Sequence, residues 1–181
     1  MQKLTISAGV LLLVVAVLAV PSRSQQDKSK RPSPPATAKC TFPDGKTITT
    51  DYSSPRMKGR KVEGGLEPWG KVWRAGANEA TTFVTDADVT IDGKNVPAGS
   101  YTIFTVPNEK EWQLIVNKKT GEWGIPYTWQ SDELFRAPMK VTSLPAPLED
   151  FTISYANEGD ACQLRMDWNV TRAYVNINEK K

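Results

Sequence analysis

The chain of 181 residues contains no histidine, and only two of its residues are cysteine. Without histidine, a Ser–His–Asp triad and a histidine-ligated zinc site are both excluded. The two cysteines do not form a Cys-x-x-Cys motif, so the sequence gives no support to thiol redox catalysis. Any reaction or binding by this chain therefore depends on carboxylate, cationic and aromatic side chains.

The sequence also lacks the apolar pattern of a helix. Past residue 24, no window of eleven residues shows a 3.6-residue apolar period. Short β-branched and aromatic runs alternate instead with turn signals such as Asp44-Gly45 and Asp92-Gly93. In the clearest run, residues 162–169, apolar and polar side chains alternate strictly. These patterns predict an all-β fold, namely an antiparallel β-sandwich that is jelly-roll-like.

Only one stretch of the chain is strongly apolar, and it lies at the start. Lys3 precedes eleven apolar residues from Val10 to Val20, and the small-residue run Ser22-Arg23-Ser24 follows. This pattern is typical of a secretory signal peptide, and eleven apolar residues fall short of the about 20 that span a bilayer. We expect residues 1–24 to be removed, which makes the protein periplasmic or secreted with no membrane span. Retention of the segment as an anchor is the alternative.

The charge of the remaining chain is nearly balanced. Removal of residues 1–24 takes away two basic residues and no acid, which leaves 21 basic against 20 acidic residues. Such a balance gives no argument for a nucleic-acid or membrane-surface partner. Residues 25–38 are polar and proline-rich, so we expect a disordered spacer there. A single domain is expected over residues 39–178, followed by a tail at 179–181, and the oligomeric state stays open.

Cys40 and Cys162 are an even pair of cysteines in a chain that we expect to reach an oxidising compartment. Such a pair favours one disulfide, with two buried thiols as the alternative. Cys162 lies on the inward face of its strand, so its bond to Cys40 would join the first strand to one near the C-terminus. By the chain-entropy argument, the closed loop is worth about 4–5 kcal/mol.

Residues 54–83, here called the glycine-rich ribbon, differ from the rest of the chain. Five of the 12 glycines fall between Gly59 and Gly76, and two prolines exclude a long helix. Six basic residues are interleaved with Trp69 and Trp73, and only two acids precede Gly76. We expect this ribbon to form an ordered crossover that covers the open end of the β-domain.

Two interpretations of the ribbon stay open. In the structural one, its tryptophans fill the core and its arginines pair with carboxylates such as Glu79. In the functional one, the ribbon lines a concave site for an anionic or hydroxylated ligand, such as a sugar or an acidic cell-envelope fragment. The candidate ligand-binding residues are Arg56, Lys58, Arg60, Trp69, Trp73, Arg74, Asn78 and Glu79.

A carboxylate pair is the catalytic alternative. Glu79 with Glu63 or Glu67 would serve a carbohydrate hydrolase, which needs two acids at a set separation. We favour a binding or accessory module over this enzyme and over a purely structural envelope protein, and we assign no catalytic residue. The spaced aspartates of residues 86–92 fit a solvated hairpin better than a calcium loop. We therefore expect no metal site and no cofactor.

The ribbon and the strands after it resemble a known family. Within the ribbon, the motifs SPR, KGR, GGL-x-P-x-GKVWR and GANEAT follow in this order, and the strands continue as VPAGSYTIFTVPNEKEWQLIVNK. This pattern is similar to an uncharacterised bacterial family of exported proteins, domain-of-unknown-function family 2911, over about residues 40–177. The resemblance implies an extracytoplasmic β-rich domain and brings no established activity, substrate or catalytic residues.

Overall fold

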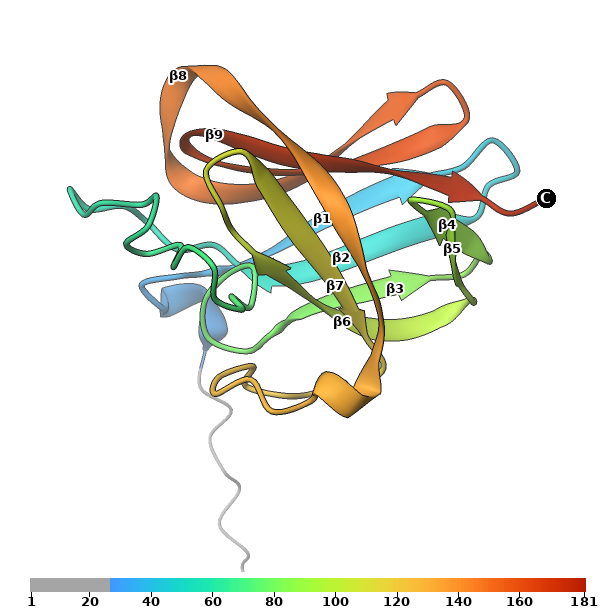
Figure 1. The fold of residues 1–181 in the computed structure, drawn as a ribbon, viewed down its shortest axis with the longest axis horizontal. Coiled ribbons are helices and arrows are strands. Elements are labelled where there is room, and N and C mark those ends of the chain that lie inside the picture. The colour runs from blue at the N-terminus through green and yellow to red at the C-terminus, as the bar shows by residue number, and fades with distance from the viewer. Residues whose placement is uncertain (1–26) are drawn as a thin grey trace, which may run out of the picture.

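The structure, a computed structural model, describes residues 27–181 (Figure 1). The expected signal peptide, residues 1–24, lies outside the described residues. Apart from two short 3-10 helices, every regular element of residues 27–181 is a β-strand, so the prediction of an all-β fold is confirmed. No helix in this part of the chain has the length and apolar character that crossing a membrane requires.

All nine strands pair antiparallel in one sheet, in the spatial order β1-β2-β3-β6-β7-β8-β9-β4-β5. The Asp44-Gly45 and Asp92-Gly93 turns close the β1–β2 and β4–β5 hairpins, as the turn signals predict. The elements are η1 (Lys28–Lys30), β1 (Pro35–Thr41), β2 (Thr47–Ser53), β3 (Thr81–Thr85), β4 (Val89–Ile91), β5 (Lys94–Val96), β6 (Gly99–Val106), β7 (Glu111–Asn117), η2 (Gln130–Asp132), β8 (Glu133–Glu158) and β9 (Ala161–Glu179).

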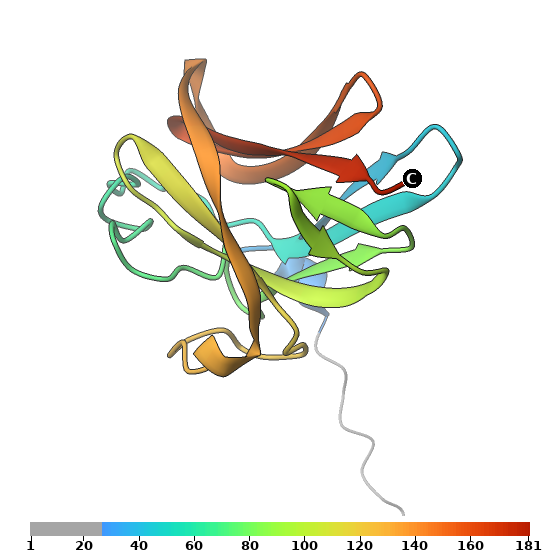
Figure 2. The same cartoon turned by 45° about the vertical axis from the view of Figure 1, so that its right-hand side comes forward.

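Strands β8 and β9 are much longer than the others and turn the sheet back over itself (Figure 2). The β8–β9 register shifts between Ser143 and Leu148 and again between Leu148 and Thr152. Pro145 and Pro147 fall in this stretch, where a missing N–H breaks the ladder of hydrogen bonds. The result is one curved sheet that is not closed, and the sandwich and jelly-roll form stay predictions.

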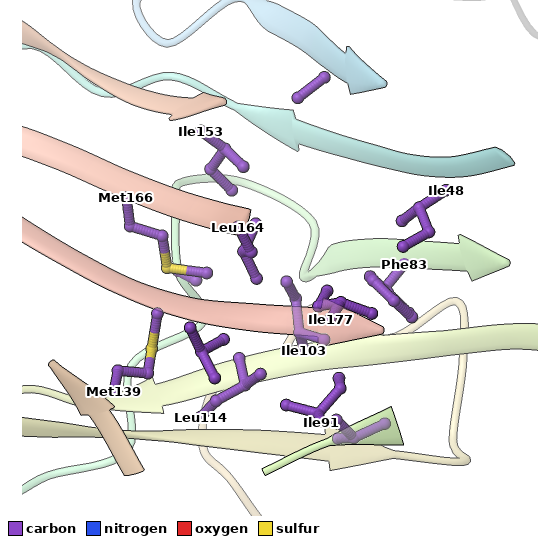
Figure 3. Packing of buried hydrophobic residues seen from close by; sticks show 14 of the residues in the cluster. Ile48, Phe83, Ile91, Ile103, Leu114, Met139, Ile153, Leu164, Met166 and Ile177 are labelled. Atoms are coloured by element: carbon purple, nitrogen blue, oxygen red, sulfur yellow. The ribbon is translucent and has the colours of Figure 1, made fainter. Parts of the chain in front are cut away.

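The core lies on the inner face of this curved sheet, where side chains of β2 and β3 pack with those of β9 (Figure 3). Ile48 and Phe83 come from β2 and β3, while Leu164 and Met166 come from β9, and all four are at most 1% exposed. Burying one such side chain stabilises the fold by about 1.5–3 kcal/mol. The alternation of β9 thus places its apolar face inward, as its sequence predicts.

Cys40 of β1 and Cys162 of β9 form a disulfide, with 6.1 Å between their Cα atoms. This confirms the predicted link between the first strand and a strand near the C-terminus. The two cysteines are 122 residues apart in sequence, so the bond closes most of the described chain into one loop.

The N-terminal segment differs from the spacer expected over residues 25–38. Strand β1 begins at Pro35 and pairs with β2 from that residue onward. Ahead of it, Arg31 donates both to Oε1 and to Oε2 of Glu79, and the Ser54 N–H donates to the Pro34 carbonyl. Proline is tolerated at the first residue of an edge strand, so a proline-rich composition does not prevent pairing here. The first paired strand thus begins four residues before the expected domain start at residue 39, and the domain limits stay a prediction.

The glycine-rich ribbon has no helix or named strand before β3, yet it is tied to the sheet along its length. Isolated antiparallel bridges join Arg56 to Asp150 of β8 and Trp73 to Thr105 of β6. The ribbon forms the teal loop beside β6, β7 and β9 in Figure 1. Because Val62, Trp73 and Ala75 are buried in the core cluster, the ribbon is part of the folded body.

Candidate functional site

A cavity of about 200 Å³ lies where the ribbon meets the β6–β7 turn and strand β9. We call it the acidic pocket, because three glutamates border it and no lysine or arginine is among the described residues that line it. The lining residues are Glu63, Glu67, Trp69, Asn108, Glu109, Trp112 and Thr171.

A tight turn in the ribbon brings Glu63 beside Glu67. The Val62 carbonyl accepts hydrogen bonds from the N–H groups of Gly65 and Glu67, at 3.0 and 2.9 Å. Glycine is required at residue 65, since a Cβ atom there would overlap the Lys61 carbonyl oxygen. Val62 is buried and anchors the turn, and a parallel backbone bridge then joins Glu63 to Glu67. The turn therefore brings both residues to the lining of the pocket.

Strand β9 holds the carboxylate of Glu63 in place. The Asn169 side-chain amide donates to both carboxylate oxygens, at 3.1 and 3.0 Å. The Thr171 hydroxyl donates to Oε1 of the same group, at 3.2 Å. These three hydrogen bonds occupy acceptor positions of the Glu63 carboxyl group. They also tie the ribbon to a strand more than one hundred residues away in sequence.

The environment of Glu67 is the opposite of that of Glu63. Its side chain is 1% exposed, and its Oε2 atom is buried with no hydrogen-bond partner among the described residues. Burial, and then the negative charge of Glu63, raise the pKa of Glu67 to about 8. A buried oxygen without a donor costs about 1–3 kcal/mol, so a ligand that supplied a hydrogen-bond donor there would recover this free energy.

Trp69 places an indole at the rim of the pocket. Its side chain is 45% exposed, yet its ring packs against the backbone at Gly64, where a Cβ atom would lie 3.4 Å from the ring. The next residue, Gly70, donates its N–H to the Pro107 carbonyl of the β6–β7 turn, at 2.9 Å. The indole thus packs against the ribbon backbone at Gly64, and the Gly70 hydrogen bond fixes the backbone next to Trp69.

A larger groove, of about 610 Å³, runs beside strands β7, β8 and β9. Charges of both signs line it, including Lys110, Glu111 and Lys140, together with Tyr174. Among residues 27–181, buried side-chain oxygens without a partner occur only at Glu67 and Thr105, and neither lines this groove. Within the same residues, no group of three or more aspartate, glutamate or cysteine side chains is placed to hold a metal ion. The acidic pocket is therefore the stronger candidate site.

Comparison with known families agrees with the motifs of the ribbon. The family model described as "Protein of unknown function (DUF2911)" matches residues 33–177. The chain belongs to the DUF2911 family. No curated protein and no solved structure matches it. The DUF2911 match includes the ribbon, the β6–β7 turn and strand β9, and so every residue that lines the acidic pocket.

In this DUF2911 chain, the eight candidate ligand-binding residues are distributed over several places. Trp69 is the one that lines the acidic pocket. Trp73 is 8% exposed and packs with Trp112, Phe151 and Trp168 in the core, as the structural interpretation expects.

Arg56, Lys58 and Arg60 lie together where the ribbon leaves β2. The Arg56 side chain forms an ion pair with Asp150 at 2.8 Å and donates to the Ser54 carbonyl and hydroxyl. Arg60 donates to the backbone carbonyls of Arg56 and Met57, and the exposed Lys58 donates its N–H to the Glu149 side chain. The two guanidinium groups of this cluster are engaged with the protein itself.

Arg74, Asn78 and Glu79 contact the N-terminal segment and the β7–η2 loop. The Arg74 guanidinium lies 5.3 Å from the Trp123 ring centre and donates to the Trp123 carbonyl. The Asn78 amide donates to the Ser33 carbonyl. Glu79 forms ion pairs with Arg31 and Lys28, at 2.8 and 3.1 Å. The structure thus places Glu79 in a surface ion-pair cluster outside the acidic pocket, so neither predicted pair, Glu79 with Glu63 or Glu79 with Glu67, lines it. Glu63 and Glu67 line the pocket together.

The residues that complete the acidic pocket come from parts of the chain that the sequence did not single out. Asn108 and Glu109 form the β6–β7 turn, while Asn169 and Thr171 lie on β9. One signal in the sequence pointed toward the pocket, because Glu63 and Glu67 are the only acids of the ribbon before Gly76.

Proposed function

We propose that the protein is an extracytoplasmic binding module that holds a carbohydrate in the acidic pocket. The observation that carries this proposal is the buried Oε2 atom of Glu67, which lacks a donor at a pocket rimmed by the exposed indole of Trp69. A sugar hydroxyl supplies the missing donor, and the ring carbons of a sugar supply an apolar face for the indole.

The size and chemistry of the pocket support a small hydroxylated ligand. A cavity of about 200 Å³ is smaller than the about 300–1,000 Å³ of pockets that enclose drug-sized molecules, so it suits a single sugar ring. Carboxylate oxygens accept hydrogen bonds, while Asn108 and Thr171 offer both donors and acceptors. An anionic ligand has less support at this pocket, because Glu63 and Glu109 would repel it.

An extracytoplasmic location is supported by the disulfide between Cys40 and Cys162. Disulfides persist in oxidising compartments and are rare where glutathione keeps thiols reduced. The proposed binding of cell-envelope or extracellular glycans is consistent with this location.

Glycan binding by the full chain is the direct test. We expect a glycan array to give binders, and titration calorimetry to show that Trp69→Ala weakens the best of them by about tenfold or more, since one lost anchor costs about 1.4 kcal/mol or more. Trp123→Ala is the matched control, because Trp123 is 53% exposed and does not line the pocket. Absence of any binder, or equal losses in both variants, would refute the proposal.

Hydrolysis of the bound glycan is a second candidate, favoured by the unequal environments of Glu63 and Glu67. One carboxyl group of the pair accepts hydrogen bonds from Asn169 and Thr171 and the other is buried without a donor, and glycosidases likewise hold their two acidic residues in unlike environments. The test is release of reducing ends from the glycan that binds. Hydrolysis predicts that Glu67→Gln abolishes release, whereas a pure binding module gives no release even with the unaltered chain.

A further inference from the structure

The acidic pocket presents negative charge and acceptors with no cationic partner of its own. Glu63, Glu67 and Glu109 border it, and its lining has no lysine or arginine among the described residues. A neutral sugar would satisfy hydrogen bonds there but would leave the cluster of carboxyl groups without a positive partner. A ligand that also brought a positive charge would complement the whole lining.

Two glutamates of the pocket, Glu63 and Glu67, differ in the hydrogen bonds that they accept. Three hydrogen bonds from β9 satisfy Glu63, while the Oε2 atom of Glu67 has no donor and is buried. An ammonium group carries three N–H donors and no acceptor, whereas a hydroxyl group donates only once. An ammonium group is therefore the better partner for a carboxyl pair in which one oxygen still lacks a donor.

The indole at the rim adds to this preference. A cation positioned over the face of a tryptophan is attracted by the negative face of the ring. The exposed Trp69 lies beside Glu67 and Glu63, so one small cationic group can contact an indole and a carboxylate together. The chain contains such a contact elsewhere, where Arg74 lies over Trp123.

We propose that the acidic pocket recognises the amino group of an amino sugar as an ammonium ion, with Glu67, which ionises against the bound ammonium, as its acidic partner and Trp69 as its aromatic one. This inference rests on the proposed carbohydrate-binding function and names the class of ligand. Replacement of the amino group by acetamide removes its charge and adds bulk, and replacement by hydroxyl removes the charge and two donors. Both changes weaken binding at this pocket.

The experiment compares β-1,4-linked hexamers of glucosamine, N-acetylglucosamine and glucose, which differ only at carbon 2. Titration calorimetry of the full chain at neutral pH and low salt is expected to show the glucosamine hexamer at least about tenfold tighter than the other two. Added salt is expected to narrow this difference, because screening weakens the interaction between charges. The salt series separates the effect of charge from that of shape.

Glu67→Gln, which keeps the shape of the side chain but cannot ionise against a bound ammonium group, is the decisive variant. We expect it to abolish the preference for the glucosamine hexamer over the glucose hexamer. Glu63→Gln serves as a second variant should Glu67→Gln fail to fold, and Glu79→Gln is the control, since Glu79 pairs with Arg31 and Lys28. The preference should survive in Glu79→Gln.

The outcomes separate this inference from the proposed function. Equal binding of the three hexamers, or a preference that persists in Glu67→Gln, overturns ammonium recognition and leaves carbohydrate binding intact. If the N-acetylglucosamine hexamer binds more tightly than the glucosamine hexamer, ammonium recognition is likewise overturned and carbohydrate binding is left intact. Failure of all three hexamers also overturns the inference, and the glycan array then decides whether the protein binds carbohydrate at all.

Discussion

The indole of Trp73 stacks on that of Trp168, with ring centroids 6.1 Å apart and planes 14° from parallel. Trp112 and Phe151 meet the same Trp73 ring edge-on, at 6.4 and 5.0 Å. Trp73 belongs to the glycine-rich ribbon, while its three neighbours belong to β7, β9 and β8. One ribbon side chain thus fills the core between three strands, and the ribbon contributes to stability as well as to the pocket.

Replacement of Trp73 by alanine tests this role. We expect Trp73→Ala to lower the free energy of unfolding by about 3–5 kcal/mol, because a large buried aromatic side chain leaves a cavity. Urea denaturation measures the change. Trp69→Ala is the matched control, and with an indole that is 45% exposed it should cost much less. Equal losses in the two variants would contradict the assignment of Trp73 to the core.

The disulfide allows a second test of stability. In a variant with Cys40→Ser and Cys162→Ser, we expect a loss of about 4–5 kcal/mol, because the two residues are 122 apart in sequence and the unfolded chain gains the freedom of an open loop. The urea midpoint is compared with that of the oxidised parent chain. Reductant should bring the parent chain to the same midpoint, and an unchanged midpoint in the variant would show that the bond contributes little.

The strands of this fold were predictable where turn signals and alternation agree. Residues 162–169 alternate apolar and polar side chains, and β9 buries the apolar ones. The curvature was not predictable, because it depends on where the long β8–β9 ladder shifts register near Pro145 and Pro147. The start of β1 at Pro35 was missed for a similar reason, since composition alone does not show that an edge strand accepts a proline.

The location of the candidate site was easier to predict than its chemistry. The glycines and tryptophans of the ribbon indicated a candidate site there, and Trp69 borders a pocket. The ribbon has more basic than acidic residues, which favoured an anionic ligand. Arg56 and Arg74, however, form contacts within the protein itself. Asn169 reaches Glu63 across 106 positions of sequence, and no local pattern reports a contact over that separation.

Arg56 provides a test of the internal role of these cations. Its side chain pairs with Asp150 and donates to the Ser54 carbonyl and hydroxyl, so it fastens the ribbon to β8. We expect Arg56→Ala to reduce the free energy of unfolding by about 1–3 kcal/mol, with glycan affinity unchanged. Lys58→Ala, at an exposed side chain, should change neither quantity. If Arg56→Ala loses glycan binding but keeps its stability, Arg56 is part of the ligand-binding site.

Glu67 makes the stability of the protein depend on pH between about pH 4.5 and 8. Its pKa rises from 4.5 to about 8 on folding, through burial first and the charge of Glu63 second. Below about pH 4.5 both the folded and the unfolded chain hold the proton, so the full stability is present. Between about pH 4.5 and 8 the unfolded chain releases its proton first, and the free energy of unfolding falls until the folded group also ionises.

The chain has no histidine, the side chain whose ordinary pKa lies between about pH 5 and 8. The lowered pKa values of Glu79 and Glu133 act at more acidic pH. We expect urea denaturation to show a loss of roughly 2–4 kcal/mol from pH 5 to pH 8 in the parent chain, and a nearly flat profile in Glu67→Gln, whose amide does not ionise. The matched variant Glu79→Gln should keep the slope. If the parent chain is equally stable at both pH values, the Glu67 carboxyl is either solvated or paired, and the central feature of the acidic pocket is absent.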